Sequence, residues 1–467
     1  MADAGSSING FAPLDRLETT TDRLTGRAGI SLFSRYLREL GIFPFLERLF
    51  GSIRKSSKGL PVPLLFHQLF CFFLDGTNLS LTRFDELAED GGYAGAIEVA
   101  RDAMVSSHQV KRFFQAFSFG HVFQFRRLLQ RLFLWRLEVA QPEMVILGMD
   151  SMVLDNSDAE RREGVGSTYK TGVSGFHPFQ ITWRRLVVDA VFRGGSKHSN
   201  EGKTAHRALR HLVPKIREVL GEEVPIVVRM DSGFFDQTLF AVCEELGIGY
   251  VGTGKLYSDL KARIERRPDF AFRRHESDEQ AWRYLSFFDR RGSWDRYRRA
   301  LFLKPVYEDE QKLLDFSRPE RLLYTNLGTG GLVDRRLEEA GREGMLRPGQ
   351  VIECYHGRGR DELVHRALKD FGTEQLPFRR FDPNAAFFYV MLTAFNLQET
   401  FKEDGLEGAV PLTSYATRLR RQVVDIAGKI IRTGGELILK VPEAVARRLD
   451  LRALWEAVAD PPRFAPA

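Results

Sequence analysis

The sequence predicts an α/β protein: a mixed sheet flanked by helices, preceded by an all-helical region. Between residues 144 and 255, apolar runs of strand composition alternate with helical segments, which is typical of a sheet buried on both faces. Before residue 140, apolar residues recur at three- and four-residue steps, the period of an amphipathic helix. The chain has 467 residues, enough for about two to four domains of ordinary size.

Composition excludes several classes of protein. Hydrophobic residues make up 43% and charged residues 28% of the chain, so neither a disordered nor a fibrous protein is expected. The net charge of +6 indicates a weak preference for a polyanionic partner. Three widely spaced cysteines without zinc spacing favour a reducing, cytoplasmic compartment. No apolar run reaches the ~20 residues of a membrane span, and no signal peptide for export is expected.

The N-terminal part is predicted to hold a flexible tail and a helical domain. Residues 1–25 are polar and too poor in apolar side chains to order themselves, whereas 26–140 form the helical domain. Within it, Ser106 and Ser107 precede Lys111 and Arg112 in a predicted helix. A serine cap and a basic first turn suit contact with DNA, as in the second helix of a helix-turn-helix. A capped surface helix with solvated charges is the alternative.

The remaining elements follow in order. Residues 141–254 contain predicted strands at 144–150, 184–192, 224–231 and 249–255, with helices at 201–221 and 235–247. Residues 255–345 combine many charges with aromatic strand-like runs, which predicts a β-rich insertion rather than a continuation of the sheet. Residues 346–400 are helical again. Residues 401–467 are predicted as a helical C-terminal region that includes a basic amphipathic helix over 415–432.

Two predicted strands end in an aspartate, Asp150 and Asp231. Ligands of open α/β sheets gather at the carboxyl ends of the strands. Two carboxylates there repel each other unless a cation lies between them, and hard oxygen ligands suit Mg²⁺. Alternatively, each aspartate only caps the loop or helix that follows it.

A third group of polar residues follows in the segment CYHGRGRDELVHRALKD. At 100° per residue, Tyr355, Arg358, Glu362 and Lys369 fall within about 60° of one helical face. A core stripe would not have this composition, and a solvent-facing ladder of ion pairs has little use for tyrosine. A set of surface ion pairs around Glu362 remains the structural alternative.

The spacing Y-x2-R-x3-E-x6-K, placed after two strand-end aspartates, resembles the signature of bacterial insertion-sequence transposases of the DDE type, which move DNA by cut-and-paste. The resemblance implies an RNase H-like catalytic domain formed by 141–254 and 346–400. It also implies a β-rich insertion (255–345) before the last acidic residue, and a helical N-terminal DNA-binding domain.

The same resemblance implies the chemistry. Asp150, Asp231 and Glu362 would bind two Mg²⁺ ions, with Mn²⁺ able to substitute, for an in-line displacement at a DNA phosphodiester. Water would first release a 3′-OH, which then attacks the opposite strand to give a hairpin and later joins target DNA. The expected partners are double-stranded DNA, as terminal inverted repeats and target, and further copies of the chain in a homodimer or larger assembly on paired ends. No membrane and no nucleotide cofactor are expected, and the site of action is the bacterial cytoplasm, at the nucleoid.

Further DNA contacts are expected from the remaining signature residues and from two tryptophans. Arg358, Lys369 and Tyr355 would contact phosphates. Trp282 and Trp294, both in the insertion, are candidates for holding a base taken out of the stack during hairpin formation. The alternative for both tryptophans is the small core of the insertion.

Two other functions remain open on the sequence alone. One is an RNase H-like nuclease that hydrolyses DNA without strand transfer. The other is a catalytically silent, transposase-derived DNA-binding regulator.

Overall fold

A nine-stranded mixed sheet forms the centre of the molecule. The computed structural model describes residues 14–54, 59–277, 280–306 and 320–465. Strand β2 (Val145–Ser151) pairs in parallel with β8 (Ile226–Met230), which pairs in parallel with β9 (Gly249–Thr253). On its other side β2 is antiparallel to β6 (Phe179–Trp183), which is followed at the edge by β7 (Leu186–Val191). The predicted mixed sheet is therefore confirmed.

Helices cover both faces of this sheet, as predicted. Val228 of β8 packs in the core formed with α8 (Thr204–Leu220) and α9 (Gln237–Glu245), whereas its neighbour Val227 packs in the core under α11 (Leu332–Glu339) and α12 (Pro348–His356). Successive residues of a strand point to opposite faces, so both faces of β8 are buried. Helix α13 (Arg358–Phe371) lies against β2 and β6.

The predicted insertion is rich in strands but does not form a separate layer. Its strands extend the central sheet in the order β10-β11-β12-β13-β9; they are β10 (Arg273–Glu276), β11 (Ala281–Asp289), β12 (Arg298–Val306) and β13 (Arg321–Thr325), preceded by α10 (Ser258–Glu265). The expectation that the insertion departs from the sheet is wrong. The physical reason is that β9 would otherwise be an edge strand with unpaired backbone groups, which β13 satisfies.

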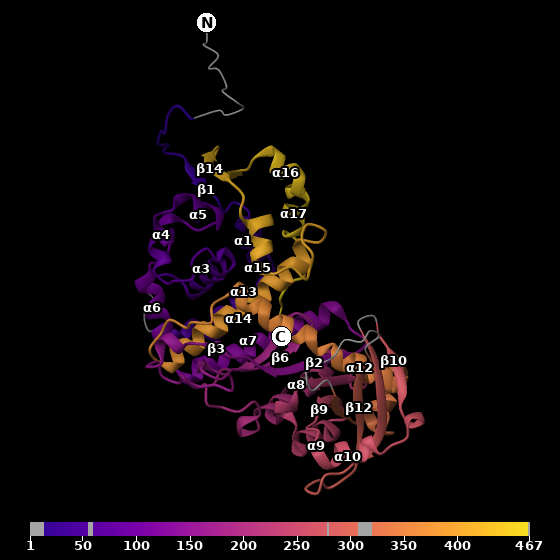
Figure 1. The fold of residues 1–467 in the computed structure, drawn as a ribbon. Coiled ribbons are helices and arrows are strands. Elements are labelled where there is room, and N and C mark those ends of the chain that lie inside the picture. Colours follow the sequence, from indigo (N-terminus) through magenta and orange to yellow (C-terminus); the bar gives the residue numbers. More distant parts are fainter. Residues whose placement is uncertain (1–13, 55–58, 278–279, 307–319, 466–467) are drawn as a thin grey trace.

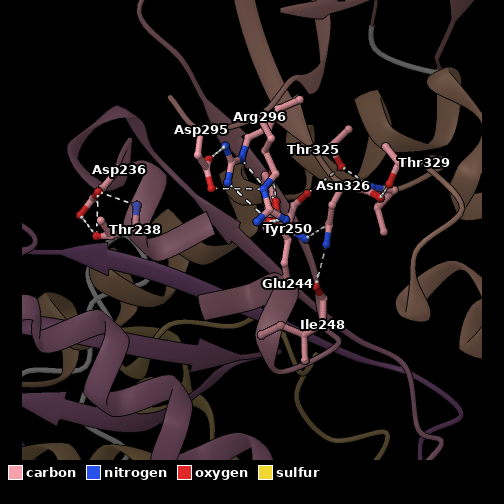
Figure 2. Close-up of polar contacts among 12 residues, drawn as sticks. Asp236, Thr238, Glu244, Ile248, Tyr250, Asp295, Arg296, Thr325, Asn326 and Thr329 are labelled. Atoms are coloured by element: carbon pink, nitrogen blue, oxygen red, sulfur yellow. Dashed lines mark hydrogen bonds and ion pairs between the residues drawn. The ribbon is translucent and has the colours of Figure 1, made fainter. Parts of the chain in front are cut away.

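Side chains reinforce the joint between β13 and β9 (Figure 2). The Thr325 hydroxyl donates to the carbonyl oxygen of Tyr250 over 2.7 Å. The Asn326 amide donates to the carbonyl of Ile248 and accepts from the backbone N–H of Tyr250, each over 2.9 Å. The insertion is therefore fixed rigidly to the strand next to β8.

The N-terminal part is helical, and one helix from the far end of the chain passes through it. Its helices are α1 (Ile30–Leu40), α2 (Phe43–Phe50), α3 (Val62–Asp75), α4 (Arg83–Glu89), α5 (Gly91–Ala96), α6 (Ser107–Gln115) and α7 (Phe119–Ala140). Helix α14 (Phe381–Gly405) packs against α1, α3, α6 and α7 and also against β7. No helix within the described ranges has the length and apolarity needed to cross a membrane.

The C-terminal region contains a β-hairpin where helix was predicted. Helix α15 (Ala416–Leu419) continues into a short π-helix (Arg420–Val424). The chain then forms β14 (Gly428–Thr433) and β15 (Glu436–Lys440), followed by α16 (Glu443–Leu449) and α17 (Leu451–Ala457). The helical prediction for 415–432 fails beyond Val424, because Gly434 and Gly435 both adopt positive φ and form a tight hairpin turn.

Strand β1 (Arg23–Thr25) pairs with β14. The last residues of the predicted flexible tail are thus ordered by partners more than 400 residues away, while residues 1–13 lie outside the described part. In Figure 1 the N-terminal helices and this C-terminal hairpin occupy one end of the molecule, and the extended sheet edge occupies the other.

Candidate active site

Asp150 lies near the end of β2, with its side chain largely buried (17% exposed). One carboxylate oxygen accepts from the backbone N–H of Ser151 over 2.8 Å. Burial raises the pKa of Asp150 above its usual value, and the charge of Glu362 adds to the rise. A carboxylate in such a place is stabilised by a cation.

Asp231 follows β8 directly and caps the short 3-10 helix Ser232–Phe234. Its carboxylate accepts from the backbone N–H of Gly233 over 2.8 Å. Met149 and Met230, the residues just before the two aspartates, are register partners in the parallel pair β2–β8. Burial raises the pKa of Asp231, and so does the charge of Asp150. The two strand-end aspartates therefore lie at the same edge of the sheet, as predicted.

Glu362 lies in the second turn of α13, and its side chain is 47% exposed. It is linked to Asp150 through Arg358, one helical turn earlier. The Arg358 guanidinium pairs with Glu362 and lies 3.8 Å from the carboxylate of Asp150. Burial opposes the charge on Arg358, but Glu362 and Asp150 outweigh burial and raise the pKa of the guanidinium. The structure thus links Glu362 to Asp150 through Arg358, which is the counter-charge of both.

His365 is a neighbour of this site that the sequence reasoning did not single out. Its Nδ1 lies 3.7 Å from the Asp150 carboxylate, one helical turn beyond Glu362. Burial lowers the pKa of the imidazole to about 4, so the ring is neutral near pH 7. The i, i+3 spacing from Glu362 was the available signal for it, because such residues share a helix face.

The donor chemistry of this site fits a divalent cation, because its acids are oxygen donors. Asp150 and Asp231 have raised pKa values because each is buried close to another negative charge, Glu362 for Asp150 and Asp150 for Asp231. No group of three or more His, Cys, Asp or Glu side chains in the described part of the chain has the spacing of a formed metal site. Arg358 instead supplies the positive charge between Asp150 and Glu362.

Tyr355 lies on a different helix from the other signature residues. Helix α12 ends at His356, and α13 begins at Arg358. The four residues therefore do not share one continuous helix, because the helix is interrupted at Gly357 and only Arg358, Glu362 and Lys369 belong to α13. The Tyr355 hydroxyl accepts from Arg321 over 2.9 Å and from Thr253 over 3.1 Å.

A polar cavity of about 420 Å³ opens beside Glu362. Its walls include Trp282, Arg321, Tyr355, Arg358 and Glu362. The cavity therefore joins three of the four signature residues to one of the two candidate tryptophans. Its lining of cations, a phenol and an indole can accept a phosphate and a base.

The two tryptophans differ in their surroundings. The Trp282 ring lies 4.8 Å from the His356 ring, and its indole N–H has no hydrogen-bond partner among the described residues. Trp294 packs 5.6 Å from Phe235 and 5.1 Å from Tyr324 in the core. Both tryptophans are buried in hydrophobic clusters, Trp282 with 7% and Trp294 with 8% of its surface exposed, so the structural alternative fits both.

The other predicted DNA-binding residues lie apart from the carboxylates. Lys369 pairs with Glu374 over 2.6 Å at the far end of α13. Lys111 and Arg112 lie on α6, which begins with a capping box between Ser106 and Gln109, and Arg112 is exposed. The predicted serine cap is present.

The sequence matches a family of known proteins over nearly its whole length. The family described as "Transposase DDE domain group 1" matches residues 15–461. The chain belongs to this family. Family membership confirms the resemblance to DDE transposases that the signature predicted, and the mixed sheet and its flanking helices confirm the predicted fold class.

The chain was also compared with curated proteins and with solved structures. No curated protein matches the chain. Among solved structures, a piggyBac transposase in a synaptic complex with hairpin DNA is similar with a TM-score of 0.43 and 11% identity, covering 85% of this chain and 78% of that one.

Proposed function

We propose that this member of the transposase DDE family catalyses cut-and-paste movement of an insertion sequence, through DNA cleavage and strand transfer at terminal inverted repeats. The convergence of Asp150, Asp231 and Glu362 from three distant segments carries the proposal. In the strand order β7-β6-β2-β8-β9, β2 is antiparallel to β6 on one side and parallel to β8 on the other. This arrangement supports an RNase H-like catalytic unit. The chain acts on paired ends as a dimer or larger assembly, at the bacterial nucleoid.

The three carboxylates hold two Mg²⁺ ions in this proposal, and Mn²⁺ substitutes for them. When bound, the metals activate the attacking oxygen and stabilise the departing 3′ oxygen at a phosphodiester. Asp150 and Asp231 are fixed by their strand ends and by backbone N–H donors. Arg358 exchanges its contact with Glu362 for a DNA phosphate, which its planar fork can bind in a bidentate manner.

The cavity beside Glu362 holds the end of the bent strand. Arg321 and Tyr355 present a cation and a hydroxyl for phosphate, and Trp282 presents an aromatic ring for a base. Lys369, Lys111 and Arg112 contact the DNA backbone farther from the reacting phosphate. In this proposal Trp282 rather than Trp294 supports the flipped base, because only Trp282 lines the cavity.

The test is a cleavage assay on labelled element ends with Mg²⁺ or Mn²⁺, resolved on denaturing gels. Wild-type protein should give nicks, hairpins and strand-transfer products. Asp150→Asn, Asp231→Asn and Glu362→Gln should each lower the cleavage rate by roughly 10²–10³-fold while retaining DNA binding, because a lost metal ligand removes several kcal/mol of transition-state stabilisation. Asp259→Asn on the exposed surface of α10 is the matched control.

Other outcomes assign other functions. Nicks that never become hairpins or joined products indicate a nuclease without strand transfer. Specific binding of the ends without cleavage in either metal indicates a silent regulator. Equal cleavage by wild-type protein and the three carboxylate variants contradicts the proposed site.

A further inference from the structure

We propose that Arg229 and Asp361 are a positioning pair, which fixes the three carboxylates of the site relative to one another. The inference rests on the proposed function, because it concerns how the same three carboxylates are held. The Arg229 guanidinium donates to the Asp361 carboxylate over 2.7 Å, and the side chains are only 11% and 3% exposed. Both side chains are largely buried, so the pair acts mainly through the segments that carry it.

Each member of the pair lies within two residues of a carboxylate of the site. Arg229 lies on β8, two residues before Asp231, and Asp361 directly precedes Glu362. Across the sheet, Arg229 is the register partner of Gly148, which lies two residues before Asp150. One buried ion pair therefore connects β8 to α13 beneath the site and lies against β2.

Two glycines leave the space that the pair occupies. A Cβ atom on Gly148 would lie 2.4 Å from Cγ of Asp361, and one on Gly357 would lie 2.2 Å from Nη1 of Arg229. Neither glycine has a positive φ, so their small size rather than their backbone freedom is what the pair requires. Gly357 is also the residue between α12 and α13. The pair thus packs against the junction of α12 and α13, five residues before Glu362.

The pair also separates two adjacent acids. Neighbouring residues of a helix point about 100° apart, and Arg229 holds Asp361 inward while Glu362 remains exposed. Buried ion pairs contribute little to stability compared with apolar residues of similar volume. Oδ2 of Asp361 and Nε of Arg229 have no hydrogen-bond partner in the described ranges. Orientation of Glu362, rather than stability, is what the pair contributes.

The experiment measures Mn²⁺ binding by electron paramagnetic resonance of the free ion, alongside thermal unfolding, binding of end DNA without metal, and cleavage. Asp361→Asn removes one charge, and the double variant Arg229→Met/Asp361→Leu replaces the pair by apolar side chains. Asp189→Asn is the control, because Asp189 forms a buried bidentate pair with Arg126 between β7 and α7. Asp231→Asn defines the loss of the metal site itself.

We expect Mn²⁺ to bind at least tenfold more weakly to Asp361→Asn and to the double variant, with unchanged DNA binding and a Tm of the double variant near that of wild type. The control should lower Tm without changing Mn²⁺ affinity. Suppose that a pair variant that remains folded binds Mn²⁺ and cleaves DNA as wild type does, while Asp231→Asn loses Mn²⁺ binding. That result overturns the positioning role and leaves the proposed function standing. If Asp231→Asn binds Mn²⁺ as wild type does and wild type does not cleave, the proposed function fails and the positioning role with it.

Discussion

Two glycines inside the signature, Gly357 and Gly359, have different surroundings. Gly357 is buried against the Arg229 guanidinium, whereas Gly359 is exposed within α13 with no atom near its missing side chain. In the sequence they are equivalent departures from helix propensity. Only the position of Arg229 distinguishes them.

This difference predicts opposite effects of the same substitution. Gly357→Ala should lower the free energy of unfolding by about 1–3 kcal/mol, because the methyl group collides with a held guanidinium. Gly359→Ala should raise it by about 0.5–1 kcal/mol, because alanine loses less backbone entropy in a helix. Denaturant unfolding of both variants checks this. A shift in the same direction for both would contradict the packing described around Gly357.

Helix α3 shows how an element can be correctly predicted while its polar contents are decided by packing. Its residues from Leu65 to Asp75 are all buried, including His67 and Gln68. The Ser34 hydroxyl donates to the Ile97 carbonyl over 2.9 Å and lies 3.1 Å from Nε2 of His67, so it accepts from that nitrogen. Burial lowers the pKa of His67 from 6.5 to about 4. The imidazole is therefore neutral in the folded protein.

The buried imidazole predicts loss of stability in acid. Because the unfolded chain binds the proton near pH 6.5 and the folded protein only near pH 4, the contribution of His67 is constant above pH 6.5 and falls between pH 6.5 and 4, by about 3 kcal/mol. Urea unfolding of wild type and His67→Gln across this range measures the difference. A parallel pH dependence in the two proteins would contradict it.

Most elements of the central sheet were predictable, and the exceptions have local causes. Apolar runs at 144–150 and 224–231 became β2 and β8, since strands buried on both faces are mostly apolar. Strand β6 was not predicted, because FQITW mixes polar and apolar residues, and its Gln180 and Thr182 are nonetheless buried. The β14–β15 hairpin was mistaken for a helix, since its basic residues also fit a helical period.

At the scale of the whole molecule, α14 joins the N-terminal helices to the sheet in one core. Phe387 lies 5.3 Å from Phe73 of α3, and Tyr389 stacks at 5.6 Å on Phe125 of α7, while Phe388 lies 5.3 Å from Phe192 after β7. These residues belong to one continuous hydrophobic cluster. The domain boundary predicted at residue 140 therefore does not coincide with a boundary of the core.

This shared core predicts that residues 26–140 do not fold alone. Without α14, the apolar faces of α3 and α7 are exposed to water, and the fragment loses the burial that orders its helices. Circular dichroism and amide NMR of the fragment should show reduced helix and poor dispersion, with the full chain as the control. A cooperative, well-dispersed fragment would contradict the shared core.

The sequence by itself determined the resemblance to DDE transposases, because the residue types of the signature, their spacing and their order along the chain survive without coordinates. The sequence could not decide which side chains are buried and which stay exposed once the helices pack. Only the tertiary structure separated Asp361 from Glu362, ended one helix at His356, extended the sheet through β13 and buried Trp294 in the core. Each of these depends on contacts between residues distant in the chain, where the free energy of packing outweighs local propensity.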